Sequence, residues 1–514
     1  MRVAMTGTSG NMGREVLKQV LELNEVELVK ILLTNKRKNN RLSRRLKKQY
    51  GTRIEILRGT VADKDVCRAL VEDVEYVVHM AAVIPPASDA DPEDSRECNL
   101  LGAMAIVDAI KERKPQPKYI HISTMALYGN RSIARPFGRV GDPLTVSPFD
   151  YYAMHKLRGE RYVLDAELDC FAVLRQTAML HPNMMADNIK DGLMFHTTLN
   201  APLEWVSSRD SGYLIKRILQ RDGNGEVPQF WNNIYNIGAG KKGMDTGYDT
   251  FKDGFAIIGG SPEKFFKPHW FATRNFHGMW FADGGELEDM FAFQRDDVSE
   301  YWKEIGKMHK IYALGRLVPA KLMYLFLFRR LRFHRNSPDR WLRDGDIPRV
   351  TATFGSVEQA NALPQKWSEV KLASKGDFGD YDQMRDVSRL TRDDLFCHGY
   401  DEGKRILDWN IDDYRQAAAF RGGEVVSQAA DSPYKKITWR CADGHEFEAT
   451  PFAVLRGGHW CDKCCYPTPW SFDKISKTNP YVAQAWYDSH NKNEDVIYDL
   501  DGSGNSLMSK ITEE

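Results

Sequence analysis

The hexapeptide YYAMHK, residues 151–156, combines two phenols and an ammonium group at a spacing that could support proton transfer. On a helix, Tyr152 and Lys156 would lie one turn apart on the same face. A free phenol, with a pKa of about 10, exchanges protons poorly near neutrality. A neighbouring cation favours phenolate and so lowers that pKa toward the working range. The spacing therefore predicts an acid–base pair, but these six residues alone leave Tyr151 and a solvated helix surface as alternatives.

A second group of residues has the spacing of a metal site near the C-terminal end of the sequence. Four residues form two half-sites separated by fifteen residues: Cys441, His445, Cys461 and Cys464. Two Cys/His turns joined by a short hairpin supply the four ligands that tetrahedral Zn²⁺ requires. Reduced cysteines without metal are the alternative, Cys465 is a spare thiol, and His459 is a competing ligand.

The first strand and helix predict a phosphate-binding turn. Arg2 to Thr6 is short and apolar, and helical spacing begins after Gly13. Glycines at this junction let a pyrophosphate approach backbone N–H groups at a helix N-terminus, where a Cβ would intrude. The residues expected to contact the cofactor are Gly7, Thr8, Ser9, Gly10, Asn11, Met12 and Gly13.

The end of the second predicted strand, residues 27–33, indicates which dinucleotide binds. Enzymes that use NAD usually place an acid there for the ribose 2′-hydroxyl. No Asp or Glu occurs from Val29 to Arg53, and Asn35, Lys36, Arg37 and Lys38 follow the strand instead. These residues favour a 2′-phosphate, so we predict NADP(H), with NAD(H) as the alternative. A solvated basic helix face explains Arg44 to Lys48.

Several further motifs occur in a characteristic order over residues 1–240. They are TGxxGxxG, the HMAA strand end at residues 79–82, a helix with Asn99, ISTMALYG at residues 122–129, YxxxK, LRQTAMLHP and YNIGAG. In this combination the chain resembles an extended short-chain dehydrogenase/reductase of the NAD-dependent epimerase/dehydratase family. The resemblance implies an α/β fold, a Rossmann-type doubly wound parallel sheet with a smaller substrate-binding part.

The resemblance also implies roles for individual residues. Tyr152 becomes the acid/base, Lys156 also holds the nicotinamide ribose hydroxyls, and Tyr151 becomes a packing residue. Thr124 would hydrogen-bond the substrate oxygen, with Ser123 as a stand-in, although strand-end capping is the alternative for both. Asn99 would support a proton path, or else it caps a helix N-terminus. Further cofactor contacts are expected at Ala81, Ala82 and Pro182.

The substrate is less constrained by the sequence than the cofactor. Dehydratases of this family carry an Asp-Glu pair where this chain has Met125 and Ala126, which argues against dehydration. The aromatic segment at residues 265–302 is expected to be core, or a lid over a bulky apolar substrate, and His277 within it a core histidine. We predict hydride transfer on a ketone or secondary alcohol. The rivals are a nucleotide-sugar epimerase and a non-enzymatic NADP(H)-sensing scaffold.

The 514 residues predict several structural units. We expect an NADP(H)-binding core at 1–240, a substrate-binding insertion at 241–410, a zinc ribbon at 411–466 and a tail at 467–514. The ribbon resembles zinc-ribbon domains with the pattern WxCxxGHxWxA and GxWCPxC. Its four ligands predict a structural Zn²⁺, and the nucleotide site is expected to need nothing from it.

Charge and hydropathy limit the partners. The net charge is zero, which gives no global argument for nucleic acid or membrane. The apolar run inside residues 317–333 is too short to span a bilayer, so a buried or substrate-covering helix is favoured over one lying at a membrane surface. Scattered cysteines and an N-terminus without a signal-peptide pattern predict a cytoplasmic protein. A small-molecule substrate is expected and a homodimer is compatible.

Overall fold

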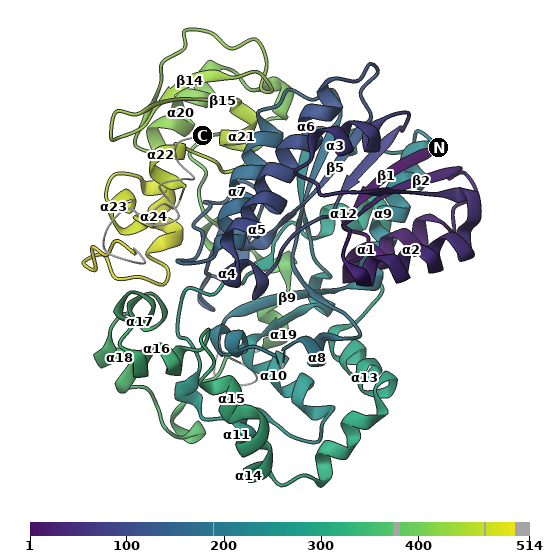
Figure 1. Cartoon of the computed structure of the whole chain (residues 1–514). Coiled ribbons are helices and arrows are strands. Elements are labelled where there is room, and N and C mark those ends of the chain that lie inside the picture. The colour runs from purple at the N-terminus through teal and green to yellow at the C-terminus, as the bar shows by residue number, and fades with distance from the viewer. Residues whose placement is uncertain (189, 374–380, 467–468, 499–514) are drawn as a thin grey trace.

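A seven-stranded parallel sheet forms the centre of the computed structural model, which describes residues 1–188, 190–373, 381–466 and 469–498 (Figure 1). The strand order is β10-β7-β5-β4-β1-β2-β3. The bounds are β1 (Arg2–Thr6), β2 (Leu28–Leu33), β3 (Ile54–Arg58), β4 (Tyr76–His79), β5 (Lys118–Thr124), β7 (Phe171–Gln176) and β10 (Asn233–Ile237). From β1 the chain first adds β2 and β3 on one side, and then β4, β5, β7 and β10 on the other. This reversal of strand order next to β1 confirms the predicted doubly wound Rossmann sheet.

Helices cover both faces of this sheet because its strands are apolar on both sides. Val3 and Met5 pack into one core, and Ala4 between them packs into the other. One face carries α3 (Lys64–Val71), α6 (Gly102–Lys111) and α7 (Tyr151–Leu164), and the other carries α1 (Asn11–Val20) and α9 (Ser208–Gly223). Helix α2 (Arg37–Tyr50) follows β2 and packs against β3. The sheet thus brings its carboxyl ends, with the predicted site residues, to one edge.

The second part of the chain builds a smaller lobe at the bottom of Figure 1. Strands β8 (Ala178–Leu180), β9 (Pro202–Ser207) and β11 (Met244–Thr246) form a three-stranded sheet, and β6 (Phe137–Gly138) pairs with β12 (Trp280–Phe281). The helices are α8 (Met184–Asn188), α10 (Gly247–Ala256), α11 (Pro262–Phe265), α13 (Val298–Met308), α16 (Pro338–Asp344), α17 (Ile347–Phe354), α18 (Val357–Asn361) and α19 (Tyr381–Met384). Helix α12 (Gly285–Phe291) instead packs beside α9 on the central sheet.

The aromatic segment fills the core of this lobe. Buried there are Phe265, Phe266, Trp270, Phe271 and Trp302, together with residues from neighbouring helices. Phe255, Phe265 and Phe266 all pack their rings around Phe328. The core interpretation of these side chains is confirmed, and none of them is left to form a lid.

The segment at residues 317–333 is not the buried helix that we expected. Its main elements are a 3₁₀ helix at Lys310–Leu317, α14 (Ala320–Met323), a π-helical turn at Tyr324–Phe328 and α15 (Arg329–Arg332). Phe328 and Leu331 are buried, but Leu317 and Phe326 are 80% and 77% exposed. Only one side of the segment therefore packs on the protein. Among the described residues, no single helix is long and apolar enough to cross a membrane. The helices at Lys310–Leu317 and Ala320–Arg332, which are bent by 115° relative to each other, meet the length and composition criteria only when they are combined.

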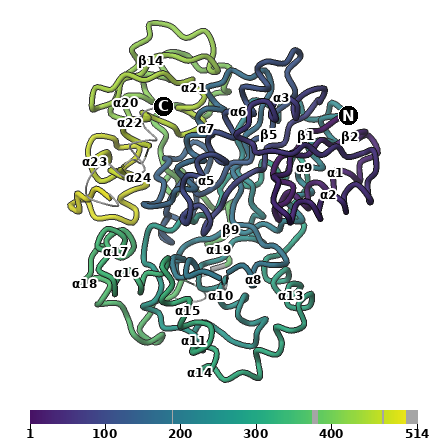
Figure 2. Tube along the Cα trace, viewed as in Figure 1, coloured from purple at the N-terminus to yellow at the C-terminus, as the bar shows by residue number. Residues whose placement is uncertain are grey.

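The C-terminal region packs on the domain that holds the seven-stranded sheet. It contains α20 (Ile411–Phe420), a three-stranded antiparallel sheet of β13 (Glu424–Val425), β14 (Ile437–Arg440) and β15 (Glu446–Ala449), α21 (Pro451–Leu455) and α22 (Asp462–Cys465). Figure 2 shows this region beside α6 and α7. Trp439, Phe452 and Trp460 join the same apolar core as Val77 and Val173 of the central sheet. This region thus shares a core with the nucleotide-binding domain, and the expectation that the nucleotide site needs nothing from it stays a prediction.

The expected tail is also largely folded. Residues 469–498 include α23 (Phe472–Ser476) and α24 (Pro480–Trp486), and residues 467–468 and 499–514 lie outside the described part. Trp470 packs edge-on against Tyr151, with 6.1 Å between ring centroids. Tyr481 donates a 2.5 Å hydrogen bond to the Gly141 carbonyl. Aromatic side chains that the sequence placed in a tail therefore complete the core around α7.

Candidate functional site

The turn between β1 and α1 has the geometry of a dinucleotide cradle. Gly7 has φ of +73°, and a Cβ there would lie 2.6 Å from the Met80 carbonyl oxygen. A Cβ on Gly13 would lie 2.3 Å from the Gly7 carbonyl oxygen. The Thr8 hydroxyl is buried and has no hydrogen-bond partner among the described residues. A helix N-terminus with an unpaired hydroxyl and no intruding side chain fits a pyrophosphate.

Other predicted cofactor residues surround this turn. Ser9, Asn11 and Met12 continue it into the first turn of α1, where no acidic residue opposes an anion. Ala81 and Ala82 follow β4, and the Ala81 N–H donates to the Thr6 hydroxyl at 3.1 Å. Pro182 follows β8, and its carbonyl lies 2.8 Å from Nε2 of His309. The residues after β1 and β4 therefore lie at the carboxyl end of the seven-stranded sheet, whereas Pro182 follows a strand of the smaller sheet.

The basic residues after β2 are open to solvent at the same edge. Asn35, Lys36, Arg37 and Lys38 are all exposed. The turn that carries them is fixed by Asn39, which is buried and donates to the carbonyl and hydroxyl of Thr34. Helix α2 starts directly after Lys36 with no acidic residue in its first turn. Lys36, Arg37 and Lys38 are thus exposed cations at the start of a helix whose first turn holds no acidic residue.

Tyr152 and Thr124 meet at the end of β5. Burial and the Asp150 carboxylate disfavour the phenolate of Tyr152, whereas the nearby Thr124 hydroxyl favours it. Burial dominates and raises the pKa of Tyr152 to about 12. The direction is opposite to the lowering that the sequence predicts for a tyrosine beside a lysine and a nicotinamide. The protein alone therefore holds this phenol protonated.

Lys156 lies beneath Tyr152 in the interior. Its Nζ donates to the Ile122 carbonyl at 2.6 Å, and its side chain is almost fully buried. Burial lowers the pKa of Lys156 to about 8, although Cys98 and Glu160 oppose this. Tyr151, on the adjacent face of α7, is buried against Trp470, as expected of a packing residue.

Two other predicted catalytic residues make different contacts from those expected. The Ser123 hydroxyl donates at 2.5 Å to Glu160, which lies on α7 two turns beyond Tyr152. Asn99 lies in a π-helical turn at Glu97–Leu101, so it does not cap a helix N-terminus. Its side chain pairs with both backbone groups of Val83, with both distances 2.8 Å. Ser123 therefore has no contact with Tyr152, and Asn99 holds the loop after β4.

A carboxylate–histidine pair beside Tyr152 was missed by the sequence interpretation. Asp150 caps α7 by accepting from the Ala153 N–H at 2.9 Å, and its second oxygen lies 3.1 Å from Nδ1 of His277. His277 is 30% exposed and is therefore not the core histidine that we expected. Nearby Asp89 is partly buried, and this burial together with Asp150 raises its pKa to about 7. Asp150 directly precedes the tyrosine pair, the one sequence signal for this cluster.

The four predicted metal ligands come together. The Sγ atoms of Cys441 and Cys464 are 3.7 Å apart, and Nδ1 of His445 is 3.5 Å from the former and 3.2 Å from the latter. The Sγ of Cys461 is 3.9 Å from the same Nδ1. Zn–S bonds of about 2.3 Å and Zn–N bonds of about 2.0 Å give tetrahedral edges of roughly 3.5–3.8 Å. The set therefore fits one tetrahedral ion.

His459 is excluded as a fifth candidate ligand by its hydrogen bonds. Its Nδ1 lies 3.1 Å from the Tyr466 hydroxyl and its Nε2 lies 3.1 Å from Oε1 of Glu160. Glu160 in turn receives two hydrogen bonds from Arg175, and both charged side chains are fully buried. His459 thus belongs to a buried network that links the ribbon to α7.

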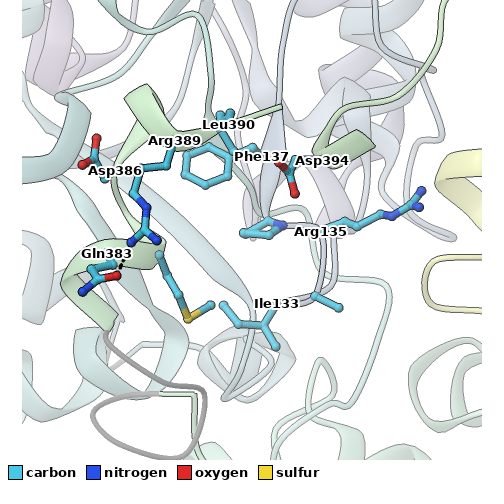
Figure 3. Close-up of a pocket in the computed structure, with 11 residues that line it drawn as sticks. Ile133, Arg135, Phe137, Gln383, Asp386, Arg389, Leu390 and Asp394 are labelled. Carbon is cyan, nitrogen blue, oxygen red and sulfur yellow. Dashed lines mark hydrogen bonds between the residues drawn. The ribbon is translucent and has the colours of Figure 1, made fainter. Parts of the chain in front are cut away.

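A separate cleft of about 380 Å³ lies away from these residues. Figure 3 shows side chains of residues 133–137 and 383–394 around it, including Arg135, Phe137 and Arg389. Neither Tyr152 nor any other predicted catalytic or cofactor-binding residue lines this cleft. It is therefore not the place where the predicted chemistry would occur.

The fold and the glycine cradle define a dinucleotide-binding α/β domain. Residues 3–238 match the sequence model of the NAD dependent epimerase/dehydratase family. This match supports an extended short-chain dehydrogenase/reductase domain for that part of the chain, which is also the part that carries the sequence motifs.

Curated relatives match only parts of the chain. An uncharacterized membrane protein of Methanocaldococcus jannaschii is 25% identical over 167 residues, which are 32% of this chain and 43% of that protein. D-erythronate dehydrogenase of Cupriavidus necator is 28% identical over 114 residues, 22% of this chain and 34% of that enzyme. The chain thus spans less than half the length of these relatives.

Among solved structures, dTDP-glucose 4,6-dehydratase from Bacillus anthracis in complex with NAD is similar. It has 15% sequence identity and a TM-score of 0.47, and the alignment covers 61% of this chain and 98% of that one.

Proposed function

We propose that the protein is an NADP(H)-dependent oxidoreductase that transfers hydride between the nicotinamide and a ketone or secondary alcohol. The observation that carries this proposal is the proximity of the Thr124 hydroxyl to Tyr152, with Lys156 buried one turn along the same helix, at the same sheet edge as the glycine cradle. A protein that only sensed the dinucleotide would not need this pair. The similarity to D-erythronate dehydrogenase agrees with a dehydrogenase, although it covers 22% of the chain.

In this proposal one residue orients the substrate and another transfers the proton. Thr124 hydrogen-bonds the substrate oxygen and Tyr152 gives or takes its proton. The bound nicotinamide supplies the hydride and, when oxidised, a positive charge that favours phenolate. Because burial raises the pKa of Tyr152 to about 12, the residue is protonated before reaction and starts as the acid for carbonyl reduction.

The proposed 2′-phosphate contact gives a testable prediction. Arg37→Ala is expected to raise the Kd of NADPH by about tenfold or more, because a hydrogen-bonded charge pair is lost. The Kd of NADH should not change. Fluorescence titration of both cofactors measures this, with Arg45→Ala, an exposed cation on the same helix, as the control. Wild-type protein that binds NADH as tightly as NADPH would contradict the proposal.

We further propose that Cys441, His445, Cys461 and Cys464 hold one structural Zn²⁺. The donor distances carry this proposal, and a four-ligand shell leaves no position for catalysis. The ligand loop also touches the catalytic helix. Arg161 of α7 donates to the Trp460 carbonyl at 3.1 Å and to the Glu448 carbonyl at 2.8 Å. Bound zinc would thus hold the loop on which α7 rests.

The network between ribbon and α7 should matter for stability. Glu160→Gln leaves Arg175 with an uncompensated charge in the interior, so we expect a loss of about 3–5 kcal/mol in the free energy of unfolding. Urea denaturation at neutral pH measures this. Glu112→Gln is the matched control: Glu112 also accepts two hydrogen bonds from one arginine, Arg68, but both side chains are about half exposed. That change should cost no more than about 1 kcal/mol. Equal losses in the two variants would contradict a structural role for the buried pair.

The substrate proposal rests on fewer observations. Met125 and Ala126 are buried apolar residues at the positions where dehydratases carry acids, so elimination of water is not proposed. The aromatic side chains of residues 265–302 that pack in the lobe's core give no support to a bulky apolar substrate. Epimerisation remains the rival. It would leave the cofactor tightly held and unchanged in net oxidation state, so absorbance at the NADPH band during turnover separates the two reactions.

A further inference from the structure

The exposed apolar side chains of the described residues are concentrated in one short segment. Twelve large hydrophobic residues are exposed, and seven of them fall between residues 308 and 326. They are Met308, Ile311, Leu314, Leu317, Leu322, Leu325 and Phe326. Soluble proteins rarely expose so many contiguous apolar residues unless something binds them.

Six of these residues, all but Met308, lie on two short helices that we name the elbow: the 3₁₀ helix at Lys310–Leu317 and the helical run at Ala320–Arg332, bent by 115°. Ile311, Leu314 and Leu317 recur every three residues, which places them on one face of a 3₁₀ helix. Leu322, Leu325 and Phe326 share one face of the second helix. The elbow thus presents apolar side chains on both of its arms.

The inner side of the elbow is anchored on the protein. Tyr324 stacks on Trp270, with 5.7 Å between ring centroids, and Phe328 is fully buried among the aromatic residues of the lobe. Because these inner residues already provide the packing that the elbow needs, its outer apolar residues contribute nothing to that core. Figures 1 and 2 place the elbow, labelled at α14, at the end of the molecule farthest from the seven-stranded sheet.

The charge of this region is strongly positive in a chain whose net charge is zero. Residues 305–338 contain no Asp or Glu and eight Lys or Arg residues. Five of these cations are exposed on or at the ends of the elbow: Lys310, Arg316, Lys321, Arg329 and Arg330. Among the described residues, none of the five forms an ion pair. Apolar side chains flanked by free cations match the boundary between acyl chains and anionic headgroups.

We propose that the elbow docks the protein on an anionic membrane surface, with Leu317, Leu325 and Phe326 inserted below the headgroups. The arginines at residues 329 and 330 would lie at headgroup level, since long cationic side chains reach out to phosphates. Neither arm is long enough to span the bilayer. The proposal therefore concerns attachment to one face of a membrane and is independent of the reaction proposed above.

Co-sedimentation with vesicles tests this inference on the full chain. Wild-type protein should bind vesicles of equal parts phosphatidylcholine and phosphatidylglycerol, bind pure phosphatidylcholine more weakly, and dissociate as salt rises. Leu325→Asp/Phe326→Asp should abolish binding. Arg329→Glu/Arg330→Glu should lower the partition coefficient by about 30-fold or more, given the contribution of roughly 1 kcal/mol per cation near such a surface. Leu407→Asp, at a distant side chain that is 75% exposed against 77% for Phe326, is the matched control and should bind as wild type.

Three results would overturn the proposal. The first is a wild-type protein that binds neither vesicle. The second is binding that both elbow variants retain. The third is a dimer by light scattering that Leu325→Asp/Phe326→Asp converts to monomer without any vesicle binding by wild type, which would make the elbow a contact between two copies. Because the altered residues are exposed, thermal melting and NADPH titration should be unchanged in the variants.

Discussion

Tyr152→Phe is expected to lower turnover by about 10²–10⁴-fold, the range typical for loss of a general acid or base. The substitution keeps the aromatic ring and removes only the hydroxyl that lies beside Thr124. NADPH binding should persist, because the glycine cradle and the cations after β2 remain intact. The measurement is NADPH oxidation with a carbonyl compound that the wild type reduces, together with a cofactor titration on the same preparation.

Tyr151→Phe is the matched control for this prediction. It removes the same atom from the neighbouring residue, whose ring packs against Trp470. Turnover should stay close to that of the wild type. If Tyr151→Phe is the damaging change and Tyr152→Phe is not, the assignment of the acid is off by one residue. If neither change lowers turnover, the Asp150–His277 pair becomes the candidate for proton transfer.

Cys461→Ser is expected to lose zinc and to weaken the catalytic domain as well as the ribbon. Metal binding supplies about 10–16 kcal/mol in small zinc modules, so the ligand loop should unfold without it. That loop includes His459 and Trp460, which contact Glu160 and Arg161 of α7. We therefore expect a lower melting temperature for the whole protein and weaker NADPH binding, in contrast to the independence that the sequence suggested.

Metal analysis, thermal melting and NADPH titration on one sample check this result. Cys397→Ser changes an exposed thiol outside the four-ligand group and should keep one zinc per chain. Zinc retained in Cys461→Ser would contradict the proposed ligand set, and Cys465 would become the candidate for the fourth ligand. Zinc lost with unchanged NADPH affinity would show that contacts between the ribbon and α7 do not hold the cofactor site.

The local chemistry of this protein was predictable from its sequence because it depends on short-range patterns. The glycines at 7, 10 and 13 need a particular backbone geometry within one turn, and Tyr152 and Lys156 are four residues apart on one helix. The metal group follows the same logic, since two turns of fixed spacing bring four donors together. For these features local spacing and backbone geometry were sufficient, and the order of the motifs predicted the sheet that carries them.

The tertiary structure determined which residues contact each other when they are far apart in the sequence. Ser123 and Thr124 are adjacent and both reach α7, yet Ser123 pairs with Glu160 and Thr124 lies beside Tyr152, two turns earlier on that helix. His277 meets Asp150 across 127 residues, and His459 meets Glu160 across 299. Periodicity could not show that the ribbon packs on α7 or that one side of residues 310–332 stays uncovered. Burial and pairing at these positions depend on which distant segment arrives there, which only the folded chain determines.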